Sequence, residues 1–171
     1  MSILKSLAVM VIGLPFLLYF VVAIVGHERF WEITHGPADM GPVDFASLKK
    51  TRRPNQYLVC PSTMCRDEDR DAVSPVYNLE ATQLSTVLLE SLTDERDLQR
   101  VDEGTDPLKL RFVQRTAKMR YPDTIRIEIL PRDETTSEIA IYSQSQVGYG
   151  DAGVNGKRVR RWLARLTDHE S

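Results

Sequence analysis

Two cysteines, Cys60 and Cys65, are the only thiols in the chain. Their C-x4-C spacing in CPSTMC allows a disulfide around a small loop if the protein reaches an oxidising compartment. Free thiols are the alternative. A metal site needs about four ligands, and no histidine or second cysteine pair lies nearby in the sequence. A catalytic dithiol usually has closer spacing at a helix N-terminus. The sequence therefore favours a structural disulfide and predicts no metal ligand.

The densest polar and glycine-rich segment is YSQSQVGYGDAGVN, residues 142–155. Three glycines permit tight backbone turns there: Gly148, Gly150 and Gly153. Asp151 and Asn155 can accept backbone N–H bonds and cap the following helix. As a binding loop, its amides and the cations of that helix would hold an anion. The alternative is a strand-to-helix connection that simply needs glycines. The spacing matches neither a P-loop nor a dinucleotide fingerprint, and no cofactor is predicted.

The helix after this loop is strongly basic. It carries five cations: Lys157, Arg158, Arg160, Arg161 and Arg165. Two of them fall in the first turn, where the helix dipole disfavours positive charge. Asp151, an acidic surface or anionic lipid headgroups would explain them, and a solvated face is the alternative. Loop and helix together give the candidate binding residues: Tyr142, Ser145, Gly148, Asp151, Asn155, Arg158 and Arg161.

Three function classes stay open. The first is a binding or accessory module that uses these residues. The second is a hydrolase-like enzyme with a polar cleft near Asp123, Ser145 and Asp151. A catalytic serine needs a nearby base, the three histidines lie outside the expected core, and no catalytic motif stands out, so no catalytic residue is assigned. The third is a carrier with a large apolar cavity lined by Leu84, Leu88, Ile127 and Ile141.

The N-terminal segment predicts a membrane anchor. Residues 7–25 read LAVMVIGLPFLLYFVVAIV without a charged side chain. At about 1.5 Å per residue, a helix of this length comes close to the ~30 Å hydrocarbon thickness. A cleaved signal peptide is the alternative, but its apolar region would be about 7–15 residues long, and the only passable cleavage site lies inside the run, around residues 21–23. Residues 1–26 are therefore expected to be a transmembrane anchor.

The orientation of the anchor follows from its flanking charges. Lys5 lies before it, whereas Arg29 is accompanied after it by Glu28 and Glu32. The cluster at 49–53 begins beyond the roughly 15–20 residues that count most, so we expect an exported domain; counting that cluster would reverse the orientation. The net charge of −2 and the pI near 5.9 give no bulk positive field for nucleic acid.

The rest of the chain predicts a tether and one domain. Residues 27–56 contain two Gly-Pro pairs and are expected to be the tether. In residues 57–168, helices are predicted near 79–92, with Asn78 as N-cap, and near 156–166, with Trp162 in the apolar stripe. Period-two alternation predicts half-buried strands, one polar face each, at 108–113, 124–129 and 139–144 after a first strand at 57–59. The fold class is α+β, an antiparallel sheet of about four strands packed against two helices.

Three segments carry a family resemblance. They are Arg53-Pro54-Asn55, then RFVQRTAKMRYPDTIRIEIL at 111–130, and AIYSQSQVGYGDAGVNGKRVRRWL at 140–163. The chain resembles, over roughly residues 40–166, the bacterial family catalogued as domain of unknown function 1499. The resemblance implies a compact domain often attached to membranes or exported, and it brings no activity or catalytic residue. Together with the anchor, it gives a bacterial inner-membrane protein with a periplasmic domain, whose partners are the membrane and a membrane protein or anionic lipid.

Overall fold

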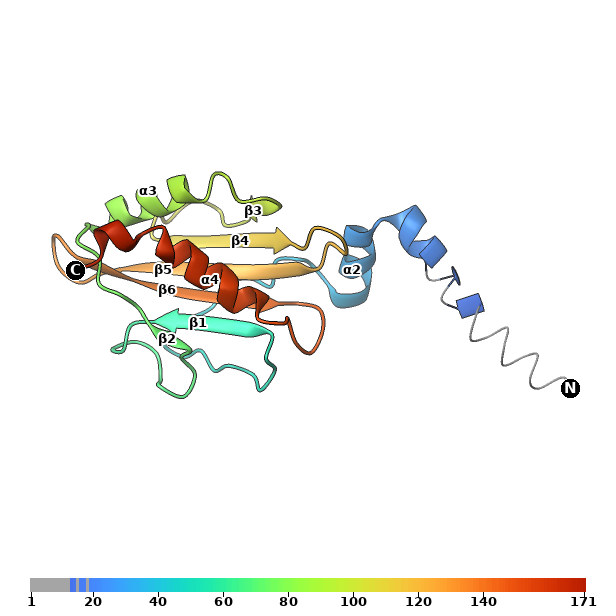
Figure 1. Ribbon diagram of the computed structural model, residues 1–171, viewed down its shortest axis with the longest axis horizontal. Coiled ribbons are helices and arrows are strands. Elements are labelled where there is room, and N and C mark those ends of the chain that lie inside the picture. Colours follow the sequence, from blue (N-terminus) through green and yellow to red (C-terminus); the bar gives the residue numbers. More distant parts are fainter. Residues whose placement is uncertain (1–12, 15, 18) are drawn as a thin grey trace, which may run out of the picture.

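A six-stranded mixed sheet forms the centre of the structure, in the order β2-β1-β6-β5-β4-β3 (Figure 1). Its strands are β1 (Gln56–Cys60), β2 (Ala72–Val73), β3 (Leu98–Arg100), β4 (Lys109–Arg115), β5 (Pro122–Pro131) and β6 (Ser137–Ser145). Neighbouring strands are antiparallel except for β1 and β2. The α+β class is confirmed, but the sheet has six strands instead of about four. The two additional strands have two and three residues, too few for an alternating pattern to be recognised.

The computed structural model describes residues 13–14, 16–17 and 19–171. Much of the expected anchor lies outside these residues. Within the described part, no helix has both the length and the apolar character needed to cross a bilayer. A short helix, α2 (His27–His35), follows the N-terminal segment and docks against one end of the sheet (Figure 1).

Two helices cover one face of the sheet, as expected. They are α3 (Ala81–Ser91) and α4 (Val154–Ala164), and a 3-10 turn, η1 (Thr167–His169), follows α4. The N-cap of α3 is Glu80 and not Asn78 as predicted. Glu80 and Gln83 form a capping box in which each side chain accepts a hydrogen bond from the other residue's backbone. This reciprocal pair satisfies two free N–H groups of the first turn, which explains why the helix begins there.

The core lies between these helices and the sheet. Trp162 is fully buried, and its ring meets Phe112 edge to face at a centroid distance of 6.3 Å. The prediction that Trp162 lies in the core is confirmed. The four residues expected to line an apolar cavity, Leu84, Leu88, Ile127 and Ile141, belong to this same buried cluster. Their side chains fill the space between helix and sheet in which a carried ligand was expected.

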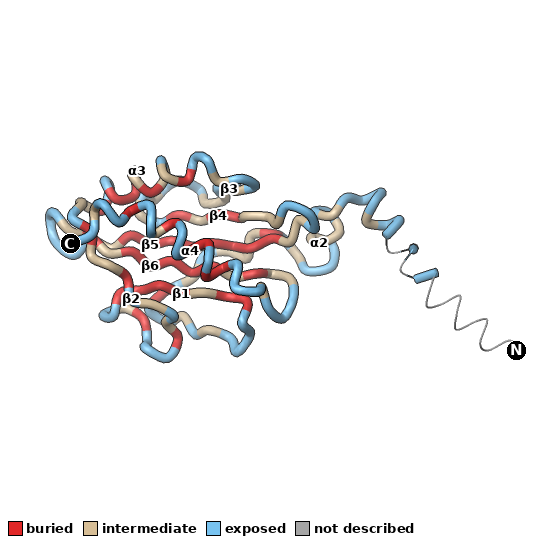
Figure 2. Tube along the Cα trace, in the orientation of Figure 1, coloured by how far each residue is buried: buried red, intermediate tan, exposed pale blue. Residues whose placement is uncertain are grey.

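The opposite face of the sheet is covered by residues 36–55, here called the strap. The Ala38 carbonyl accepts a hydrogen bond from Thr124 Oγ1 at 3.0 Å, and the Gly41 carbonyl accepts one from Arg126 Nε at 2.8 Å. Phe45 is 2% exposed. Strands β5 and β6 are buried along most of their length (Figure 2). The expectation of half-buried strands with one polar face is therefore wrong for β5 and β6, because the segment expected to be a tether packs against their second face.

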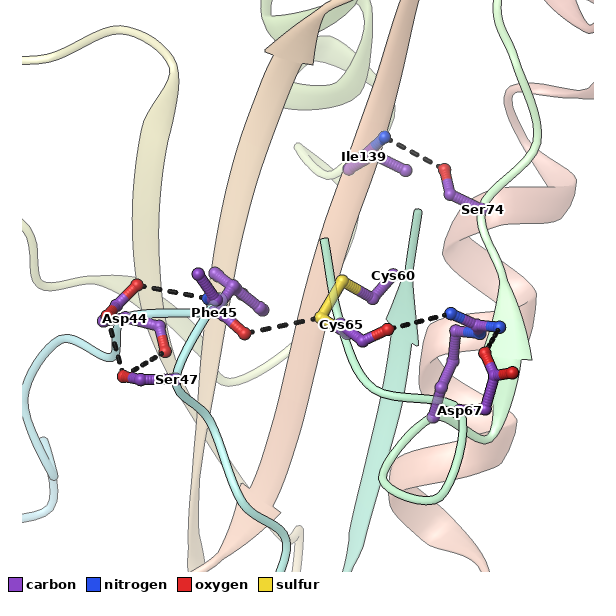
Figure 3. The surroundings of a disulfide bond; sticks show 10 residues. Asp44, Phe45, Ser47, Cys60, Cys65, Asp67, Ser74 and Ile139 are labelled. Carbon is purple, nitrogen blue, oxygen red and sulfur yellow. Dashed lines mark hydrogen bonds and ion pairs between the residues drawn. A yellow bond between two sulfur atoms is a disulfide. The ribbon is translucent and has the colours of Figure 1, made fainter. Parts of the chain in front are cut away.

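A second, smaller core holds the strap in place, and a disulfide lies within it (Figure 3). Cys60 and Cys65 are bonded to each other, and both are buried. The Phe45 carbonyl oxygen lies 3.5 Å from the Cys65 sulfur, a contact without a hydrogen bond because a disulfide sulfur has no proton to donate. Asp44 caps the strap's single turn by accepting from the Ala46 backbone and the Ser47 hydroxyl. The disulfide loop and the strap therefore pack together over the sheet.

Candidate functional site

The candidate residues gather at one end of the sheet, here called the proximal end, where β1 and β5 begin and β4 and β6 end. Asp123 of β5 pairs with Ser145 of β6 at this end, and Gln56 of β1 pairs with Gln144. Helix α2 docks at the same end. The Trp31 ring contacts Tyr121 at a centroid distance of 4.8 Å, with the ring planes tilted by 45°. Its indole N–H donates to the Met119 carbonyl at 2.7 Å, and Glu28 pairs with Arg120. The segment that precedes α2 therefore leaves the domain beside the candidate residues (Figure 1).

Arg158 of α4 is the centre of a buried polar network. It is 4% exposed, and its guanidinium donates to Asp123 Oδ2 at 2.6 Å, Ser143 Oγ at 2.9 Å, Asn155 Oδ1 at 2.7 Å and Gln114 Oε1. Asp123 and Ser143 are buried as well. A buried charge is tolerated when it is paired and hydrogen-bonded, and Arg158 meets both conditions. The residue fixes α4 to β4, β5 and β6 at once.

Asn155 extends this network to the loop and to β1. Its amide nitrogen lies within hydrogen-bond distance of the Asp151 carboxylate at 2.7 Å, Ser145 Oγ at 2.9 Å and the Asn55 carbonyl at 3.1 Å. The Asn55 side chain in turn donates to the carbonyls of Ser145 and Gly148. Asn55 and Asn155 are both buried. The start of β1, the end of β6 and the first turn of α4 are thus bonded into one unit.

The loop between β6 and α4 is held by Asp151, as predicted. One carboxylate oxygen accepts from the Gly153 N–H at 2.8 Å, and the other accepts from the Asn155 N–H at 2.8 Å. Gly153, the N-cap of α4, has a φ of 76°, and Gly148 has a φ of 93°, both in the left-handed region that favours glycine. These two glycines are therefore required by the path of the backbone.

The structure brings five of the seven candidate binding residues together: Ser145, Gly148, Asp151, Asn155 and Arg158. Tyr142 lies on the opposite face of the sheet, because successive strand residues point to opposite sides. Its hydroxyl donates to Gln56 Oε1, and Arg126 lies 5.5 Å from its ring centroid. Arg161 lies outside the network and pairs with Glu95 at 2.7 Å.

Acidic residues of the domain itself explain much of the charge on α4. Glu95 binds both Arg161 and Arg165 at 2.7 Å, and its side chain is 6% exposed. Burial raises the pKa of the Glu95 carboxyl, but hydrogen bonds from Arg161 and Gln114 outweigh this effect, and the pKa is lowered. Gln114 joins the two clusters, since it accepts from Arg158 and donates to Glu95. Arg158, Arg161 and Arg165 are therefore each paired with an acidic residue of the domain itself.

Asp123, Ser145 and Asp151 line one pocket of about 380 Å³ at the proximal end. The Asp123 carboxylate is paired with Arg158, and both oxygens of Asp151 accept N–H bonds of the helix cap. Ser145 Oγ accepts a hydrogen bond from Asn155. No histidine is among the residues that line the pocket. A serine nucleophile needs a base to take its proton, and the two carboxylates of this pocket are already engaged in other bonds.

Sequence reasoning missed three members of the network as binding candidates: Asn55, Gln114 and Ser143. Two of them carried a usable signal. Ser143 follows Ile139 and Ile141 on the same face of β6, so the strand period already points it toward α4. Asn55 belongs to the Arg53-Pro54-Asn55 motif. Gln114 carried no signal, because its role depends on arginines that lie more than 40 positions away.

Comparison with known proteins agrees with the resemblance seen in the sequence. The family model described as protein of unknown function (DUF1499) matches residues 45–166. The chain belongs to the DUF1499 family. No curated protein shows significant similarity to it. The DUF1499 match begins inside the strap and includes all members of the Arg158 network. Among the described residues, no group of three or more histidine, cysteine or acidic side chains is placed to hold a metal ion.

Proposed function

We propose that this DUF1499 protein is a membrane-tethered binding or accessory module in the periplasm that presents the loop of residues 146–153 to a protein partner near the bilayer. One observation carries the proposal. The Arg158 network fixes this loop at the proximal end, where α2 and the hydrophobic segment join the domain. The uncharged run at 7–25 supports the anchor, and Lys5 supports an exported domain. A disulfide also suits an oxidising compartment.

The internal bonding of the polar groups favours binding over catalysis. Catalytic groups need free lone pairs or protons directed at a substrate. Here the carboxylates of Asp123 and Asp151 are engaged by Arg158 and by the first turn of α4. Such a network stabilises a fixed surface instead of supplying a reactive group.

The loop and the neighbouring turn supply contact residues for a partner. Tyr149 is 71% exposed at the loop, and Met119 is 42% exposed on the β4–β5 turn that contacts α2. Tyrosine and methionine are enriched in protein interfaces, where they provide large contact areas. Holding such side chains on a rigid loop reduces the entropy that is lost on binding.

Site-specific photo-crosslinking of the full chain in native membranes tests the partner. A crosslinking amino acid replaces Tyr149 in one sample and Glu134 in a matched control. Glu134 is exposed on the β5–β6 turn at the opposite end of the sheet. We expect a defined protein adduct from position 149 and none from 134. The same adducts from both positions, or none from either, contradict the proposal.

The anchor and its orientation are tested separately. Alkaline phosphatase fused after Ser171 should be active, and a cytoplasmic reporter at the same place should be inactive. The mature chain should keep its N-terminal segment, because the apolar run lacks a well-placed cleavage site. A mature N-terminus near residue 24 would refute the anchor, and activity from the cytoplasmic reporter alone would refute the orientation.

A further inference from the structure

A basic groove lies beside the network, between residues 50–57 and the first turns of α4. Its volume is about 430 Å³. Four cationic side chains line it: Lys50, Arg52, Arg53 and Arg160. The groove is separate from the loop tip at Tyr149, which is not among its lining residues. It belongs to the proximal end, since β1 begins there.

The positive charge of the groove is only partly balanced by the protein. Asp71 pairs with Lys50, and Asp151 uses both carboxylate oxygens in the helix cap. Among the described residues, no carboxylate lies within ion-pair distance of Arg52, Arg53 or Arg160. These three guanidinium groups are therefore free to bind an external anion. The planar guanidinium matches the oxygens of a phosphate group and can donate two parallel hydrogen bonds to it.

One wall of the groove contains an aromatic ring and a closely packed glycine. The Arg160 guanidinium lies 5.1 Å from the ring centroid of Tyr57, a cation–π contact that holds it over the groove. Gly156 of α4 packs against the same ring, and a Cβ atom there would lie 3.0 Å from Tyr57 Cδ2. A larger residue at position 156 would press on the ring, which would have to shift by a few tenths of an ångström.

We propose that this groove binds the phosphate group of an anionic ligand, either a phospholipid headgroup or a soluble phosphate ester. The free arginines supply the charge, and the 430 Å³ hollow gives room for a headgroup-sized ligand. Helix α2 docks at the same end of the sheet as the groove, so the lipid as source of the phosphate rests on the proposed membrane anchor. The phosphate site stands on its own charges and does not depend on a protein partner at Tyr149.

Binding to the full chain in a neutral detergent tests the site. Native mass spectrometry measures the affinity for phosphatidylglycerol against phosphatidylcholine with the same acyl chains, and calorimetry measures the affinity for glycerol phosphate. The groove variant is Arg53→Gln/Arg160→Gln. Exposed arginines outside the groove give a control with the same loss of charge, Arg96→Gln/Arg132→Gln. The groove variant should lose roughly tenfold in affinity and the control less than about twofold.

The two probes distinguish the sources of the phosphate. Groove-dependent binding of phosphatidylglycerol alone identifies a lipid headgroup, and groove-dependent binding of glycerol phosphate shows that the phosphate group suffices. Both results support the site. If neither affinity falls further in the groove variant than in the control, the site does not exist. Thermal unfolding confirms that each variant is folded, and Arg52→Gln/Arg53→Gln, which changes two exposed residues of the strap, provides a second groove variant.

Discussion

Asn155 in the first turn of α4 donates a hydrogen bond of 3.1 Å to the carbonyl oxygen of Asn55, which lies 100 positions earlier and directly before β1. The Asn55 side chain donates back to the loop at Ser145 and Gly148. The two asparagines thus close a ring of bonds around the proximal end. A surface held in this way keeps its shape before a ligand arrives, which lowers the entropy lost on binding.

The Arg158–Asp123 pair should be strongly coupled. Removing Asp123 by Asp123→Ala leaves a buried guanidinium without its counter-charge, and we expect a loss of about 3–5 kcal/mol in the free energy of unfolding. The double variant Asp123→Ala/Arg158→Met should lose clearly less than the sum of the two single variants. Urea denaturation of the fragment 27–171 gives the free energy of unfolding of the native sequence, the two single variants and the double variant, which together form a double-mutant cycle.

A surface pair provides the control for this cycle. Lys109 and Glu128 lie 3.5 Å apart, and the Lys109 side chain is 62% exposed. Their coupling energy should be no more than about 1 kcal/mol, because solvent screens an exposed pair. Equal coupling energies in the two cycles would show that the Arg158 network does not bind α4 to the sheet as described.

Trp162→Ala should be among the most damaging substitutions in α4. The indole is fully buried against Phe112, and its removal should cost roughly 3–5 kcal/mol of stability. Arg160→Ala on the exposed face of the same helix should change stability by only about 0.5 kcal/mol. Urea denaturation compares the two variants, and similar midpoints would mean that α4 does not pack through Trp162.

The disulfide should be present in the native protein and should stabilise it. Cys60→Ala/Cys65→Ala releases a short loop, so the expected loss is roughly 2 kcal/mol in the chain-entropy model. Ser62→Ala, in the same loop and exposed, should have little effect. Intact mass after alkylation, with and without reductant, gives the oxidation state directly. Two alkylated thiols without reductant would disprove the bond.

Asp133, in the turn between β5 and β6, should make the free energy of unfolding depend on pH in the acid range. Hydrogen bonds from the side chains and backbones of Thr136 and Thr135 lower the pKa of Asp133 from 3.8 to about 2. Because the folded-state pKa is depressed, this stabilisation is complete above the ordinary pKa and is lost as the pH falls through about 2. The stability difference between native protein and Asp133→Asn should therefore be constant above about pH 5 and shrink between about pH 4 and 2. If the stability difference for Asp133→Asn stays constant over this pH range, these hydrogen bonds do not have the proposed role.

The long elements could be predicted from the sequence, and the strap could not. Period-two alternation marks β4, β5 and β6, and the spacing of Val159, Trp162 and Leu166 marks the buried face of α4. The strap has no periodicity, because an irregular chain is held by individual bonds such as those of Ala38 and Gly41 to the sheet. Its Gly-Pro pairs are typical of a tether and of a strap alike.

The sequence identified most residues of the candidate site, but it did not show which of their side chains are buried. Arg158 lies one turn from Asn155 and Trp162, on the helix face that meets the sheet, whereas Arg160 is exposed. A basic helix gives no local sign of which arginine is inside, since that depends on a buried acceptor such as Asp123 from another strand. The sequence therefore identified the candidate loop, but it did not identify the buried residues that bind to it.

The two short edge strands have a consequence for self-association. An edge strand exposes unpaired backbone groups that another chain can pair with, and the risk grows with its length. Here the edges are β2 and β3, of two and three residues, so the long central strands β5 and β6 never form an open border. A second copy of the domain therefore finds only short edge strands to pair with, which disfavours edge-to-edge association.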